Sequence, residues 1–189
     1  QRCSALRLLC LQEDIADHTL KMLRGAMAEY RVGNPELLTT DIGPVIDEEA
    51  RDNIVNHIDD MQQRGFKVTQ FSWHGESDAA ILSQGTFVRP TLIELNSAAD
   101  LTREIFGPVL HVVRYNSKNL THLLSEINQL GYGLTFGVHS RIDETINLAT
   151  ERMHAGNLYV NRNMVGAVVG VQPFGGEGLS GTGPKAGGP

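Results

Sequence analysis

The feature that most constrains the fold is the alternation of β-rich apolar runs with segments of helical periodicity. Helical spacing of apolar residues follows Asp14 and Asp47, the predicted helix caps, and recurs after Ser117 and Ser140. The runs between them predict strands at residues 6–12, 67–71, 85–95, 109–115, 135–139 and 158–160. Such alternation predicts an α/β fold with an open, mostly parallel sheet flanked by helices. Ligands of these sheets bind beyond the carboxyl ends of the strands, so the loops there are the places to search for a site.

Length and composition favour one soluble globular domain. The chain has 189 residues, of which 41% are hydrophobic and 20% charged. A net charge of -6 without a basic cluster argues against nucleic-acid contact. The start lacks Met and a signal pattern, and no apolar run is long enough for a membrane span, so we expect a piece of a longer cytoplasmic protein.

Cys3 is the candidate nucleophile. It lies in Gln1-Arg2-Cys3-Ser4-Ala5, a predicted turn directly before the first strand, where a rigid support can present its sulfur to a cleft. Packing is the competing interpretation, because cysteine is among the residues most often buried. Cys10 lies inside the apolar run, where packing is favoured. Two cysteines make no disulfide framework, and the seven histidines show no ligand spacing, so we predict no metal.

Glycine is concentrated at the end of the chain, where half of the 20 glycines lie from Gly156 onward. Glycine at this density lets backbone N–H groups approach a ligand closely. Apolar residues among them, such as Val168 and Phe174, favour an ordered site loop over a flexible tail. Residues 181–185 lack the glycine spacing of a phosphate-binding loop.

Four stretches together resemble the NAD(P)-dependent aldehyde dehydrogenases, over essentially the whole chain. They are residues 1–5, Glu104-Ile105-Phe106-Gly107-Pro108, Tyr132-Gly133-Leu134-Thr135 with Gly137-Val138, and residues 157–176 with Asn161-Arg162-Asn163 and Pro173-Phe174-Gly175-Gly176. The resemblance implies the catalytic domain of that fold, with Cys3 as the thiol that attacks an aldehyde. It also implies that Glu104 binds the nicotinamide ribose of NAD and that Phe106 walls the nicotinamide. From residue type alone, the favoured interpretation is that Glu104 caps or solvates a turn and that Phe106 belongs to a core.

A narrower resemblance concerns the substrate. Ser4 after the nucleophile, and Gly166-Ala167 ahead of Phe174, are similar to the L-glutamate γ-semialdehyde (1-pyrroline-5-carboxylate) dehydrogenases, including those of bifunctional proline-catabolic flavoproteins. The resemblance implies that Ser4, Gly166 and Ala167 anchor the substrate's α-carboxylate and that Phe174 packs on its methylene chain. A small zwitterion needs such donors and such an apolar wall. FAD would belong only to a separate proline dehydrogenase domain.

The resemblance also implies parts that this chain lacks. We expect residues 1–189 to be the nucleophile-bearing catalytic domain, with the NAD-binding domain, the water-activating glutamate and the oxyanion asparagine upstream. The expected partners are that upstream domain, the aldehyde and further copies in a homo-oligomer. We therefore expect little turnover from this chain alone, and we leave membrane association of the full-length protein open.

Three alternatives remain open. The chain could belong to another aldehyde dehydrogenase, of the succinate-semialdehyde or betaine-aldehyde type, although Gly166-Ala167 argues against it. It could be a catalytically silent module retained for assembly. A Cys/His hydrolase is the third alternative, and it would require a histidine beside Cys3.

Overall fold

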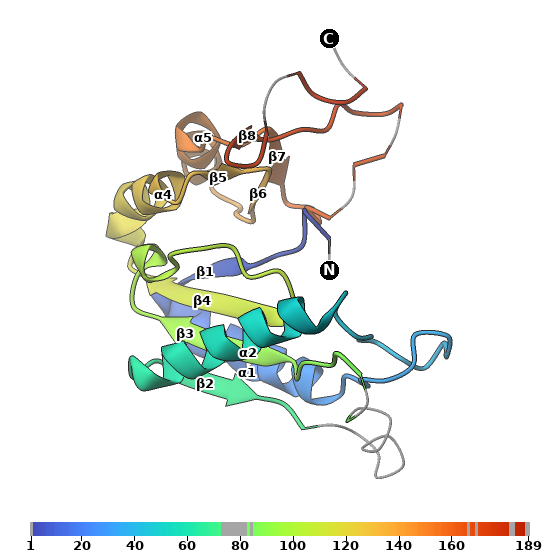
Figure 1. Cartoon of the computed structure of the whole chain (residues 1–189). Helices are drawn as coiled ribbons and strands as arrows, with labels where there is room; N and C mark the ends of the chain where they lie inside the picture. Colours follow the sequence, from blue (N-terminus) through green and yellow to red (C-terminus); the bar gives the residue numbers. More distant parts are fainter. Residues whose placement is uncertain are drawn as a thin grey trace. The chain divides into compact units, whose positions relative to one another are not determined.

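The computed structural model describes residues 2–72, 83, 85–165, 167–168, 170–181 and 184–187 (Figure 1). Contacts between Cα atoms divide the chain into two compact units. We call Arg7–Asn96 with Glu104–Arg114 the N-terminal unit, and Arg2–Leu6 with Ser97–Arg103 and Tyr115–Pro189 the C-terminal unit. Helices alternate with strands, and parallel pairs occur in both units, which confirms the predicted α/β class.

The N-terminal unit contains a four-stranded sheet in the order β1-β4-β3-β2. Its strands are β1 (Leu8–Gln12), β2 (Lys67–Gln70), β3 (Thr91–Leu95) and β4 (Val109–Tyr115, whose last residue falls in the C-terminal unit). β3 and β4 are parallel, with Leu92 beside Leu110, whereas β2 and β3 are antiparallel. The predicted strand 109–115 is confirmed residue for residue, while the strand expected from residue 6 begins at Leu8.

Helices α1 (Glu13–Ala28) and α2 (Glu48–Gln63) cover this sheet. The side chains of α1 form a core with Leu92 and Val112 on one face, and His57 of α2 contacts His111 on the other, because successive side chains of a strand alternate between faces. Asp47 caps α2 as predicted, since its Oδ1 accepts a hydrogen bond of 2.8 Å from the N–H of Ala50.

The expectation that Asp14 caps α1 is wrong. The helix begins at Glu13, so Asp14 lies inside its first turn. The N-cap residue is Gln12, whose side chain makes no capping hydrogen bond. Asp14 instead accepts a hydrogen bond of 2.7 Å from Nε2 of Gln12. Negative side chains in a first turn interact favourably with the positive end of the helix dipole. Glu13 and Asp14 therefore stabilise this turn without a side-chain cap.

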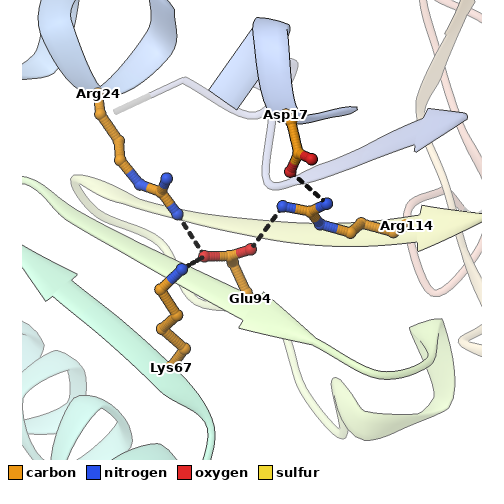
Figure 2. A network of polar contacts seen from close by, with 5 residues as sticks. All are labelled: Asp17, Arg24, Lys67, Glu94 and Arg114. Atoms are coloured by element: carbon orange, nitrogen blue, oxygen red, sulfur yellow. Dashed lines mark hydrogen bonds and ion pairs between the residues drawn. The ribbon is translucent and has the colours of Figure 1, made fainter. Parts of the chain in front are cut away.

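An ion-pair network joins α1 to β2, β3 and β4 on one face of the sheet (Figure 2). The carboxylate of Glu94 in β3 forms ion pairs with Arg24, with Lys67 at 2.8 Å and with Arg114 at 3.5 Å. Arg114 also forms an ion pair with Asp17 at 2.7 Å. Burial alone would raise the pKa of Glu94, but the hydrogen bond from Lys67 and the charges of its three partners hold that pKa below the usual range. Glu94 is therefore a charged centre shared by four elements.

The C-terminal unit contains two short sheets and the helices α4 (Leu120–Gln129) and α5 (Asp143–Arg152). β6 (Thr135–Val138) pairs in parallel with β7 (Asn157–Val160), and β5 (Tyr132–Gly133) pairs antiparallel with β8 (Glu177–Gly178). Both helices bury a core against Phe136 and Val138 of β6. Single 3-10 turns occupy Ala98–Asp100 and Ser117–Asn119.

Two helix starts in this unit differ from expectation. The helix expected from Ser117 begins as a 3-10 turn and becomes α-helical at Leu120. Ser140 does not cap α5, whose N-cap residue is Ile142, because Ser140 lies outside the helix and its Oγ accepts from the N–H of Ile142 at 3.1 Å. Within the described ranges, every helix is too short or too polar to cross a membrane.

Candidate active site

Cys3 lies on a tight turn, as the sequence predicts. The N–H of Ala5 donates to the carbonyl oxygen of Arg2 at 3.1 Å, which closes a turn with Cys3 and Ser4 at its two central positions. Cys3 is exposed, whereas Ser4 keeps only 3% of its surface exposed. Cys10 is half-buried in β1, between core residues Leu9 and Leu11. The Cys3 thiol is therefore more accessible to solvent than the Cys10 thiol.

The loop that carries Phe174 is fixed by Asn157, the first residue of β7. Nδ2 of Asn157 donates to the carbonyl oxygen of Pro173 at 2.9 Å, and its Oδ1 accepts from the N–H of Gly175 at 3.3 Å. Phe174 also exchanges two backbone hydrogen bonds of 2.9 Å with Ala186. The half-buried Phe174 is thus held on both sides, as an ordered site loop requires.

Glycine in this region allows backbone segments to touch. A Cβ atom added at Gly156 would lie 1.7 Å from the carbonyl oxygen of Gly175, and one added at Gly181 would lie 1.9 Å from that of Gly176. No side chain fits at such distances. The Pro173-Phe174-Gly175-Gly176 motif is therefore packed between two other glycines of the unit.

Asn161, the first residue after β7, turns the chain toward the predicted substrate loop. It is the non-glycine residue with positive φ in the described chain, at 54°. Its Oδ1 accepts from the N–H of Ser140 and its Nδ2 donates to the carbonyl oxygen of Ser140, both at 2.9 Å. Beyond it, Ala167 is half-buried, and Gly166 lies outside the described residues.

A cavity of about 330 Å³ lies along β7. Among the residues that the structure describes, its lining does not include Cys3, Ser4, Ala167 or Phe174; the lining residues are Asn157, Leu158, Tyr159, Val160, Arg162, Gln172, Pro173 and Lys185. Its polar groups already have partners: Nε2 of Gln172 donates to the Tyr159 hydroxyl at 2.6 Å, and Lys185 donates to the carbonyl oxygen of Gly156. We therefore do not assign the substrate to this cavity.

Glu104 and Phe106 lie in the N-terminal unit, and one residue, Arg7, touches both. Nε of Arg7 is 3.0 Å from Oε1 of Glu104, and its Cζ is 4.5 Å from the centroid of the Phe106 ring. Sequence reasoning did not select Arg7. The available signal was a lone cation inside an apolar run, since Arg7 stands between Leu6 and Leu8.

Behind Arg7 lies a buried histidine pair that the sequence spacing did not reveal. Nε2 of His57 and Nε2 of His111 are 2.8 Å apart, and His111 is fully buried. Burial, and then the neighbouring His57, lower the pKa of His111 to about 4, outweighing the hydrogen bond with the Arg7 backbone. The His111 ring is thus neutral near pH 7. In the described part of the chain, no three His, Cys, Asp or Glu side chains gather as a metal site would require.

The structure thus sorts the predicted site residues by unit. Cys3, Ser4, Ala167 and Phe174 belong to the C-terminal unit, whereas Glu104 and Phe106 belong to the N-terminal unit. The turn at Cys3 and the fixed loop at Phe174 agree with the sequence prediction. The contacts of Arg7 were not predicted.

Comparisons with known proteins agree with the family that the sequence resembles. The aldehyde dehydrogenase family model matches residues 1–189. The chain is 69% identical over 189 residues to the bifunctional protein PutA of Salmonella typhimurium, covering all of this chain and 14% of that protein. It is 39% identical over 191 residues to a 1-pyrroline-5-carboxylate dehydrogenase of Bacillus thuringiensis, covering 35% of it. A crystal structure of a proline utilization A (PutA) mutant from Bradyrhizobium japonicum superposes with a TM-score of 0.90 at 52% identity, over 99% of this chain and 18% of that one.

Proposed function

The chain belongs to the aldehyde dehydrogenase family, and from this premise we propose that it is the nucleophile-bearing part of an NAD-dependent L-glutamate γ-semialdehyde (1-pyrroline-5-carboxylate) dehydrogenase. The observation that carries the proposal is Cys3, exposed on a hydrogen-bonded turn beside the buried Ser4. The likeness to PutA and to a 1-pyrroline-5-carboxylate dehydrogenase supports the choice of substrate.

Cys3 supplies the covalent chemistry. Its thiolate attacks the aldehyde carbon and forms a thiohemiacetal, and the N–H of Cys3 helps to hold the oxyanion. Bound NAD would supply the hydride acceptor that allows oxidation to the thioester. Water then cleaves the thioester, which releases L-glutamate and returns the thiol of Cys3. An exposed sulfur on a turn fits both the attack and the later approach of water.

Ser4, Gly166, Ala167 and Phe174 would select the substrate. The Ser4 hydroxyl and the backbone N–H groups of Gly166 and Ala167 would donate to the α-carboxylate, and Phe174 would pack on the methylene chain. The position of Ser4 directly after Cys3 on the same hydrogen-bonded turn supports this role. A neutral aldehyde would not need these donors.

Glu104 and Phe106 fit the nicotinamide end of NAD. Phe106 is 43% exposed, so part of its ring can wall a planar group, and the Glu104 side chain is 39% exposed and can accept from ribose hydroxyls. The exposure of Phe106 argues against a place in a core. The two exposures support the assignment of both residues to the cofactor.

The chain spans about a seventh of the Salmonella relative and about a third of the Bacillus relative. We propose that the full-length protein supplies the NAD-binding domain, the water-activating glutamate and the oxyanion asparagine. We further propose a bifunctional proline-catabolic protein, with FAD in a separate proline dehydrogenase domain. It would act in the cytoplasm as a homo-oligomer.

The test compares the two cysteines in the full-length protein. Cys3→Ala should lower kcat for glutamate semialdehyde by at least about a thousandfold, because it removes the nucleophile. Cys10→Ala, the matched control, should keep kcat within about threefold. Iodoacetamide should label Cys3 before Cys10. Unchanged turnover in Cys3→Ala would leave the chain as a silent assembly module.

A second comparison tests the substrate. The full-length protein should oxidise glutamate semialdehyde with a kcat/KM at least about tenfold above that for succinate semialdehyde, because only the former carries the α-amino acid group. The reverse preference would assign the protein to another aldehyde dehydrogenase type.

A further inference from the structure

Arg7 links the two residues to which we assign the cofactor. Its guanidinium is 3.0 Å from Glu104 through Nε and lies 4.5 Å from the Phe106 ring centroid. Its side chain is only 17% exposed, against 39% for that of Glu104. A planar, charged group that is held on two sides fixes the orientation of both neighbours.

The backbone of Arg7 is held as firmly as its side chain. Its carbonyl oxygen accepts from the N–H of His111 at 3.0 Å and contacts Nδ1 of His111 at 3.1 Å. Because a carbonyl oxygen only accepts, Nδ1 must carry the proton, and Nε2 of His111 then accepts from Nε2 of His57. A buried chain of hydrogen bonds therefore runs from α2 through β4 to Arg7.

From these contacts we infer that Arg7 is a positioning residue for NAD, which acts through Glu104 and Phe106; the inference rests on the proposed function. Glu104 is ion-paired with Arg7, and its carboxylate oxygens can at the same time accept a hydrogen bond from a ribose hydroxyl. Arg7 lies over the Phe106 ring, and the remaining exposure of Phe106 serves the nicotinamide. Arg7 thus sets in advance the two groups that receive the cofactor.

The chain offers a matched control in Arg64. Nη1 of Arg64 is 3.5 Å from Oδ2 of Asp60, and its Cζ is 4.9 Å from the centroid of the Phe66 ring. Arg64 therefore makes the same two kinds of contact in the same unit, with Asp60 and Phe66 in place of the proposed cofactor residues. A general loss of ion pairing and ring contact should affect both arginines alike.

The experiment measures KM for NAD and kcat in the full-length protein. Arg7→Gln should raise KM for NAD about tenfold and change kcat at saturating NAD by less than about threefold. Arg64→Gln should leave both constants unchanged. If Arg7→Gln does not fold, Arg7→Lys carries the test, since it keeps the charge without the planar fork and should raise KM about threefold. An unchanged KM in the folded Arg7 variant would overturn the inference.

Glu104→Gln separates this inference from the proposal beneath it. If Glu104→Gln leaves KM for NAD unchanged, the assignment of Glu104 to the cofactor is wrong. If Glu104→Gln raises KM and Arg7→Gln does not, only the positioning role is wrong. When both roles hold, the double variant should show less than the product of the two single effects, because Arg7 acts through Glu104.

Discussion

Gly156 shows how a single atom decides the order of the loop that carries Phe174. A Cβ at Gly156 would meet the carbonyl oxygen of Gly175 at 1.7 Å, and backbone cannot move aside as a flexible side chain can. Gly156→Ala should therefore lower the free energy of unfolding by about 3 kcal/mol or more, as overpacking of a tight site does. The urea midpoint of the 189-residue chain measures the effect.

Gly25 provides the control. It lies exposed within α1, and a Cβ there would meet nothing within 4 Å. Gly25→Ala should raise the free energy of unfolding by about 0.5–1 kcal/mol, because alanine is the better helix former. A Gly156→Ala chain as stable as the Gly25→Ala chain would refute the close approach of the two backbones.

At the residue scale, the sequence predicts what local chemistry determines. Cys3 could be placed on a turn from its neighbours, and Asp47 could be named as a cap from its position before a helical stripe. The partners of Arg7 could not be predicted, because Glu104 and Phe106 lie almost a hundred residues away in sequence. Local patterns carry no information about such pairings.

The ends of helices and strands also show which predictions local sequence supports. The strand 109–115 was predicted without error because most of its residues are β-branched or apolar. Asp14 and Ser140 were wrongly taken as helix caps. The start of a helix depends on which of several nearby polar residues accepts hydrogen bonds from the first-turn N–H groups. Tertiary contacts, such as those of Asn161 with Ser140, influence which residue does so.

The His57–His111 pair makes the packing of α2 on β4 sensitive to acid. The pKa of His111 falls from 6.5 to about 4 in the folded chain, so the unfolded chain binds a proton first as the pH falls. Stability from this group is present above pH 6.5 and is lost as the pH falls toward 4. The free energy of unfolding should drop by about 2 kcal/mol between pH 7 and pH 5.

Urea unfolding of the chain at the two pH values tests this expectation. The double variant His57→Gln, His111→Leu should show a much smaller drop, whatever its stability at pH 7. His18→Gln, which changes an exposed histidine of α1, should keep the full drop. An equal drop in the double variant would mean that other groups cause the acid sensitivity.

Glu94 joins four elements through charge (Figure 2). Its side chain is 15% exposed, and its removal leaves Arg24, Lys67 and Arg114 without their shared partner. Glu94→Gln should lower the free energy of unfolding by about 2 kcal/mol, because the network is partly buried. The loss should be smaller in 1 M salt, because salt screens the exposed part of the network. Asp52→Asn should cost less than about 0.5 kcal/mol, because Asp52 is 59% exposed.

At the scale of the whole molecule, the chain matches one family along its full length but spans only part of its relatives. All 189 residues match the aldehyde dehydrogenase family, yet they span 14% of the PutA relative from Salmonella. The fold class could be predicted from this length because it depends on the chain's own patterns, whereas Cys3 as nucleophile stays a prediction. In the proposed cofactor site, this chain would contribute Glu104 and Phe106, and the sequence says nothing of the residues that other domains would add.

That incompleteness predicts weak cofactor binding by the 189-residue chain. In the proposed site, Glu104 and Phe106 would supply only one wall for the nicotinamide end. The chain should therefore bind NAD with a dissociation constant near or above about 1 mM, which corresponds to a binding free energy of only about 4 kcal/mol. It should also show no measurable oxidation of glutamate semialdehyde. The full-length protein should bind NAD in the micromolar range, because its other domains would enclose the adenosine and phosphates.

Calorimetric titration of NAD into each protein decides between these expectations. Phe106→Ala should abolish the weak heat of the 189-residue chain and should weaken binding by the full-length protein, because the same ring serves both. Micromolar binding by the chain alone would mean that it holds most of the cofactor's contacts itself. The proposed division of labour, in which this chain supplies the thiol and one wall while the full-length protein supplies the rest, would then be wrong.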